Sequence, residues 1–124
     1  MKKSFLTAGA LLAAVAVIGG AFGAHYLKTK LPAESLQTFE TGVRYQFYHA
    51  LALLAAGMLY KEFPGKLVQW AGYLFIGGII LFSGSLYILC AAPSMKWVGP
   101  VTPLGGLCFI LGWLLLAYAF TKKN

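Results

Sequence analysis

The sequence predicts an all-α integral membrane protein, a four-helix transmembrane bundle with a short interfacial amphipathic helix before the second span. Of its 124 residues, 60% are hydrophobic and only 10% are charged, whereas a soluble domain carries about 25% charged residues. Four long apolar runs alternate with short segments that contain Pro, Gly or Lys. The length leaves room for one domain, residues 1–124, and for no separate soluble module.

The first predicted span covers about residues 5–27. A cleavable signal peptide is the alternative, because Ala21-Phe22-Gly23 offers a cleavage site between small residues. The apolar run is about twenty residues long, whereas the core of a signal peptide has roughly 7–15, so we predict a retained helix. Gly19 and Gly23 form a GxxxG pair, a spacing that lets two helix backbones approach closely.

The segment 28–41 connects the first span to the second and contains the predicted interfacial helix. Pro32 suits the first turn of a helix, and Glu34 suits its positive N-terminal end. An apolar stripe at helical spacing follows. We therefore expect an amphipathic helix on the membrane surface, which bends at Gly42 into a second span of about residues 43–60.

The third span is predicted at about residues 67–89 and the fourth at about residues 103–120. Each has glycines on one face, where another helix of this chain or of another subunit could pack closely. The predicted packing positions on these two helices are Gly77, Gly84, Gly105 and Gly112.

The distribution of basic residues predicts the orientation. An even number of spans puts both termini on one side, together with Lys2, Lys3, Lys61, Lys66, Lys122 and Lys123. The other side holds Lys28, Lys30, Arg44 and Lys96. Because basic residues are favoured on the cytoplasmic side, both termini are predicted to be cytoplasmic.

Polar side chains within the predicted spans lie almost entirely in the outer half of the bilayer. The hypothesised ligand-binding residues are His25, Arg44, Gln46, His49, Ser83 and Ser85. We expect them to converge from three helices on a polar pocket open to the outer leaflet. There the Arg44 guanidinium would bind an anionic group such as a lipid phosphate through two parallel hydrogen bonds.

Arg44 and His49 also have structural interpretations. Glu40 precedes Arg44 by four residues, the order that favours an ion pair on a helix. His49 could be held by a neighbouring helix, and Tyr45, one turn before it, could fix its ring by a hydrogen bond.

Nucleophilic catalysis is not predicted. Ser83 or Ser85 with His49 would need an orienting acid, and the candidates Glu34 and Glu40 lie near the membrane surface. Each serine is expected to donate to the backbone carbonyl four residues earlier in its own helix.

No metal site and no cofactor are predicted. His25 and His49 lack a third ligand at a recognisable spacing. Cys90 and Cys108 are expected at depths about 7–8 Å apart, which is too far for a disulfide.

Four blocks of sequence resemble one known family. They are GAFGAHYL (20–27), FETGVRYQFYHALALL (39–54), GGIILFSGSLYIL (77–89) and GPVTPLGGLCFILGW (99–113). In this order, and over nearly the whole chain, they resemble the domain-of-unknown-function family 423, small four-helix bacterial inner-membrane proteins with distant relatives in animals. The resemblance implies a membrane protein without an assigned activity, and it supplies no catalytic residues.

The leading prediction is a non-enzymatic structural or interaction protein of the bacterial inner membrane. With a net charge of +7, its expected partners are the lipid bilayer, anionic phospholipids and either a second copy of the chain or another membrane protein. Nucleic acid is not a predicted partner, because no basic motif interleaved with exposed aromatic residues occurs. The alternative is a binding or transport unit for a small ligand, a lipid head group or a proton, which would use the outer polar residues.

Overall fold

The computed structural model describes residues 1–122, apart from the side chain of residue 24, and these residues form helices joined by short turns. The elements are α1 (Lys3–Ile18), η1 (Gly19–Gly23), α2 (Ala24–Leu27), α3 (Ala33–Leu59), α4 (Lys66–Gly78), η2 (Ile79–Ser83), α5 (Gly84–Ala91), η3 (Lys96–Val98) and α6 (Val101–Lys122). The π-helical turns η1 and η2 continue directly into the α-helices on either side of them. The described chain therefore forms four helical rods, α1–α2, α3, α4–α5 and α6.

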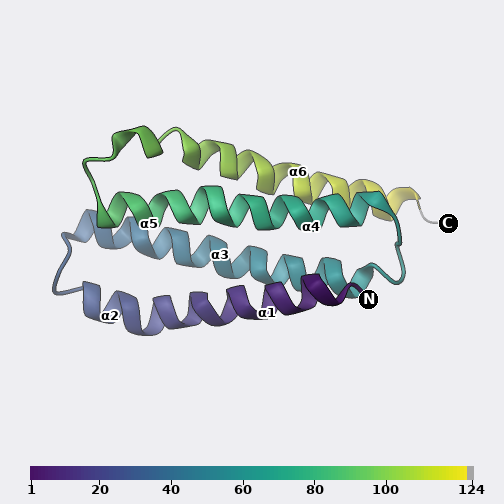
Figure 1. Cartoon of the computed structure of the whole chain (residues 1–124), viewed down its shortest axis with the longest axis horizontal. Coiled ribbons are helices and arrows are strands. Elements are labelled where there is room, and N and C mark those ends of the chain that lie inside the picture. The colour runs from purple at the N-terminus through teal and green to yellow at the C-terminus, as the bar shows by residue number, and fades with distance from the viewer. Residues whose placement is uncertain (123–124) are drawn as a thin grey trace.

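The rods lie side by side and run antiparallel in chain order (Figure 1). α3 and α4–α5 occupy the middle, α1–α2 packs on α3, and α6 packs on α4 and η2. The turn between α3 and α4 contains Gly65, whose φ of 125° is readily adopted only by glycine. As a consequence of this topology, the start of α1 and the end of α6 lie at the same end of the molecule (Figure 1).

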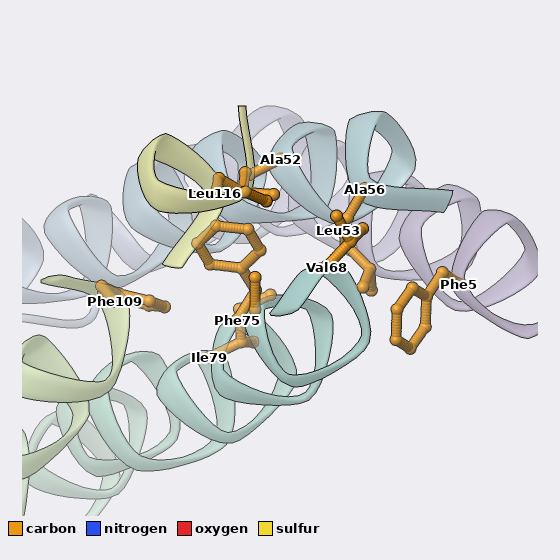
Figure 2. Packing of buried hydrophobic residues seen from close by; sticks show 11 residues of the cluster. Phe5, Ala52, Leu53, Ala56, Val68, Phe75, Ile79, Phe109 and Leu116 are labelled. Carbon is orange, nitrogen blue, oxygen red and sulfur yellow. The ribbon is translucent and has the colours of Figure 1, made fainter. Parts of the chain in front are cut away.

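One hydrophobic core joins α3, α4 and α6 and also holds the start of α1 (Figure 2). Phe75 of α4 is fully buried in this core, between Leu116 of α6 and Ile79 (Figure 2). At the other edge, the ring of Phe5 covers Gly72 of α4, where an added Cβ would lie 2.2 Å from a ring carbon. Phe5 therefore anchors α1 to α4 as well as to α3.

Glycines allow close backbone approach between α6 and the α4–α5 rod. A Cβ built on Gly105 would lie 2.3 Å from the backbone nitrogen of Phe82, and one on Gly78 would lie 3.1 Å from the carbonyl oxygen of Gly105. Gly112 lies two turns further along α6 on the same face. The ring of Phe75 packs on it, 2.7 Å from a Cβ built on this glycine. The fourth helix is thus packed through the two glycines that the sequence singled out on it.

The glycines predicted to pack on the first and third helices differ from one another. Gly23 faces a side chain of α3, with a built Cβ 3.2 Å from Phe39, and Gly19 faces α3 at a longer distance. Gly77 and Gly84 have no other atom within 4 Å of a built Cβ. Within the described chain, the groove predicted on the third helix is therefore open.

Within residues 1–122, three helical stretches are long and apolar enough to cross a membrane, namely Lys3–Leu27, Lys66–Ala91 and Lys96–Lys122. They contain the predicted spans 5–27, 67–89 and 103–120. The remaining predicted span, 43–60, lies almost wholly in α3. With 27 residues α3 is about 40 Å long, but it is less apolar than the other three rods.

The predicted interfacial helix is not confirmed as an element of its own in the described chain. Residues 33–42 form the first turns of α3, and the helix passes through Gly42 without interruption. This part of α3 packs beside α5, where the rings of Phe39 and Tyr87 lie 5.6 Å apart. Phe39 and Val43 of its apolar stripe are half-buried and also contact the glycines of η1.

Candidate functional site

The polar residues of α3 are divided between two faces of the helix. Gln46 and His49 are three residues apart, so they share a face, and only 3% and 5% of their surfaces are exposed. Gly42, one turn before Gln46, is buried on the same side. This inward face lies between α1, α5 and α6, and it contains the buried polar side chains of α3.

Gln46 connects three rods. Its amide nitrogen donates to the backbone carbonyl of Leu12 in α1 at 2.8 Å, and its amide oxygen accepts a hydrogen bond from the Tyr87 hydroxyl of α5 at 2.7 Å. The Tyr87 ring fits because Gly42 has no side chain, since a Cβ there would lie 2.8 Å from a ring carbon. The Tyr87 ring thus packs on Gly42, while the Tyr87 hydroxyl donates to Gln46.

Ser83 extends this network from η2. Its hydroxyl donates to the carbonyl oxygen of Gly42 at 2.7 Å, and the residue is fully buried. The expected bond to Ile79, four residues earlier in its own helix, is therefore wrong. A π-helical turn contains an additional residue compared with an α-helical turn, and this changes the direction of the side chains that follow Ile79.

Ser85 faces α6 instead of α3. Its hydroxyl donates to the backbone carbonyl of Phe82, three residues earlier rather than four, and also contacts the hydroxyl of Thr102 at the start of α6. Ser83 and Ser85 are two residues apart and consequently point to different neighbours.

His49 uses both of its ring nitrogens within the bundle. Nε2 lies 3.1 Å from the indole nitrogen of Trp113, and Nδ1 lies 2.8 Å from the backbone carbonyl of Tyr45. An indole N–H can only donate and a carbonyl can only accept, so Nε2 is the acceptor and Nδ1 carries the hydrogen of a neutral ring. The imidazole also stacks on Phe109 with ring centroids 3.5 Å apart. The expected contact of His49 with Tyr45 is thus made by the Tyr45 backbone.

This arrangement leaves no ring nitrogen of His49 for a metal. Among residues 1–122, no group of three or more His, Cys, Asp or Glu side chains is placed to hold a metal ion. Both cysteines are free. The Cys90 thiol lies 3.1 Å from the carbonyl oxygen of Ser35, and Cys108 lies on α6.

Arg44 lies on the other side of α3. It is exposed, and its Nη2 donates to the hydroxyl of Thr41 at 3.3 Å rather than pairing with Glu40 within 4 Å. Its side chain lines a shallow groove of about 220 Å³ between α1 and α3, together with Val17 and Tyr48. Arg44 is two residues from Gln46, and such residues do not face each other on a helix.

His25 is remote from His49. It is exposed on α2. α2 follows Gly23, which faces Phe39, so His25 lies beside the first part of α3. At 1.5 Å per residue, His25 and His49 are about 15–20 Å apart along the bundle. The six residues expected to form one pocket are therefore distributed over separate places. The structure connects Gln46 to Ser83 through Tyr87 and Gly42, and leaves His25 and Arg44 outside.

Sequence reasoning missed two partners, Tyr87 and Trp113. A signal was available for Tyr87, which is four residues after Ser83 and so shares its face. No comparable signal identifies Trp113, since its contact with His49 depends on how α6 is rotated against α3.

Comparisons with known proteins agree with the membrane character of the chain. The family model described as "Protein of unknown function (DUF423)" matches residues 19–106. The chain is 48% identical over 120 residues to the UPF0382 membrane protein SSP2132 of Staphylococcus saprophyticus, covering 97% of this chain and 98% of the relative. It is 46% identical over 121 residues to the UPF0382 membrane protein YwdK of Bacillus subtilis, covering 97% and 98% of the two chains.

No solved structure shows significant similarity to this chain. The match to the family model spans well over half of the sequence, and the relatives align over nearly their full length. The chain therefore belongs to the DUF423 family, a family of small membrane proteins of unknown function.

Proposed function

We propose that the protein is a non-enzymatic structural or interaction protein of the bacterial cell membrane, with α3 as a fourth span and both termini in the cytoplasm. The observation that carries the proposal is the pairing of the inward polar groups. Gln46, His49 and Ser83 each bond to another rod. No buried side-chain nitrogen or oxygen in the described chain lacks a partner. Groups engaged in this way hold helices together, because each buried polar atom already bonds to a protein group.

Pairing also supports the assignment of α3 as a span. A polar side chain costs free energy in lipid unless protein groups satisfy it. Gln46 and His49 are buried among the other rods, so they would not meet lipid. The side chain of Arg44 is exposed, but a long basic side chain can extend its charged end to the membrane surface while its stem covers apolar neighbours.

The cytoplasmic orientation rests on charge. The end of the bundle that holds the start of α1 and the end of α6 carries Lys2, Lys3, Lys61, Lys66 and Lys122 among the described residues. Lys123, which was counted with them, lies outside the described residues. The opposite end carries Lys28, Lys30 and Lys96, with Arg44 deeper in the bundle. The excess of basic residues favours the first end as cytoplasmic.

The structural role is tested by comparing His49→Ala with Arg44→Ala. His49→Ala removes the stacking on Phe109 and the hydrogen bond to Trp113, so we expect it to lower the free energy of unfolding by about 2–3 kcal/mol. Arg44→Ala alters an exposed residue with one local bond, and we expect a change below about 0.5 kcal/mol. Unfolding is followed by circular dichroism during titration of detergent micelles with SDS.

Native mass spectrometry of the same proteins measures whether small molecules remain bound after purification. The structural role predicts that neither substitution removes a specific bound molecule. A His49→Ala protein that keeps its stability but loses a bound molecule would favour the binding or transport alternative and contradict the proposal.

A further inference from the structure

A cavity of about 410 Å³ lies at the end of the bundle where α4 begins and α6 ends. This volume is within the range of about 300–1,000 Å³ that small-molecule sites occupy. Its walls come from the turn between α3 and α4, the first turn of α4 and the last turns of α6, and include Glu62, Phe63, Lys66, Leu67, Ala119 and Lys122. The rings of Phe63 and Phe120 lie 4.9 Å apart, so the turn is packed on the end of α6 and the cavity is already formed.

The lining residues have two kinds of chemistry. Phe63, Leu67 and Ala119 provide an apolar surface, with Ala119 buried and the other two half-buried. Lys66, Lys122 and Glu62 are exposed around it. Among the described residues, the two ammonium groups and the carboxylate give the lining a formal charge of +1, which complements a ligand with a single negative charge and an apolar part.

The position of the cavity identifies where such a ligand would come from. Lys66 is the first residue of one candidate membrane span and Lys122 is the last residue of another. The shared end of two spans lies at the level of the phospholipid head groups. The outer surface of α6 next to it is apolar and exposed at Leu114 and Tyr118, so acyl chains can follow this helix into the membrane.

We propose that this cavity binds one anionic phospholipid whose head group carries hydroxyl groups, as in phosphatidylglycerol. The phosphate lies between the ammonium groups of Lys66 and Lys122, which act as point charges. The head-group hydroxyl donates to the Glu62 carboxylate, which can only accept when ionised. The same carboxylate repels the second negative charge of phosphatidic acid. A zwitterionic lipid such as phosphatidylcholine lacks the net charge that complements the site.

The test uses the full chain in detergent micelles, with phosphatidylglycerol, phosphatidic acid, phosphatidylethanolamine and phosphatidylcholine offered separately. Native mass spectrometry gives the ratio of lipid-bound to lipid-free protein. We expect phosphatidylglycerol to bind most tightly. Lys66→Gln and Lys122→Gln should each lower its affinity about fivefold, and the double variant about thirtyfold, from the usual contribution of a basic residue near a charged membrane surface. Glu62→Gln should lower the preference for phosphatidylglycerol over phosphatidic acid.

The matched control is the double variant Lys28→Gln, Lys30→Gln, which removes the same charge from the opposite end of the bundle. It should retain phosphatidylglycerol, and Lys66→Arg, which keeps the charge, should bind within about twofold of the unaltered chain. All variants change exposed side chains and should keep their helical circular dichroism. Equal binding of phosphatidylcholine or phosphatidylethanolamine, or an equal loss of phosphatidylglycerol in the control, would show general charge attraction and overturn the proposed site.

Discussion

Two glycines of this chain allow a paired test of how α6 is packed. Gly105→Ala would place a methyl group 2.3 Å from the backbone nitrogen of Phe82 and 2.8 Å from its Cα. Backbone atoms cannot rotate away as the end of a side chain can, so α6 and η2 must separate. In Gly84→Ala the same methyl group would have no other atom within 4 Å. The two substitutions thus add the same atom to helices of the same bundle in opposite environments.

The expected magnitudes follow from these distances. Replacing Gly by Ala inside a helix is favourable by up to about 1 kcal/mol, so Gly84→Ala should be neutral or slightly stabilising. Forcing an extra methyl group into a packed interface costs about 1–3 kcal/mol, and a backbone clash belongs at the upper end of that range. After subtracting the helix preference, we expect Gly105→Ala to lower the free energy of unfolding by about 1–2 kcal/mol relative to the unaltered chain.

The assay is SDS titration of the purified chain in mixed micelles, with helicity followed by circular dichroism. Elution volume in size-exclusion chromatography reports any change of assembly, and Gly84→Leu extends the test to a larger side chain on the open face. We expect Gly84→Leu to leave the unfolding midpoint and the elution volume unchanged. A larger elution volume would place that face between two copies. A Gly105→Ala protein as stable as Gly84→Ala would refute the close contact between α6 and η2.

Two further predictions concern the buried network and the orientation. Gln46→Leu removes the bonds to Leu12 and Tyr87 and should lower the free energy of unfolding by about 1–2 kcal/mol in the same titration. Tyr87→Phe removes only one of these bonds and should lower it by about 0.6 kcal/mol. Equal losses would mean that the Leu12 bond contributes nothing. In a chain without native cysteines, a thiol placed at Lys96 should react with a membrane-impermeant maleimide added outside intact cells, and one at Lys61 should not. The opposite labelling pattern would reverse the proposed orientation.

Helix positions were predictable because they depend on features local to the sequence. Apolar runs and the breakers between them identified the rods, and the start of α3 follows Pro32 as the first-turn preference of proline suggests. The π-helical turns were not predictable. Their effect is visible at Ser83, which was expected to bond within its own helix and instead bonds to Gly42.

The candidate site was harder to predict because it depends on direction rather than depth. His25, Arg44 and Gln46 were grouped by their height in the membrane. Arg44 and Gln46 are about 200° apart around α3, from the 3.6 residues in each turn, so one is exposed when the other is buried. The same reasoning separates Gly77 from Gly78, of which only Gly78 lies against α6.

The central place of α3 explains why its composition differs from that of the outer rods. α1 and α6 expose large apolar side chains, such as Val15 and Leu114, and a polar residue there would meet lipid without a partner. α3 has rods on both sides (Figure 1), so Gln46 and His49 can be polar at no such cost once they bond to neighbouring helices. Each of these bonds also fixes the rotation of one helix against another, which interchangeable apolar side chains do less specifically. Because these polar groups are paired inside the bundle, the lower average hydropathy of α3 is compatible with α3 crossing the membrane.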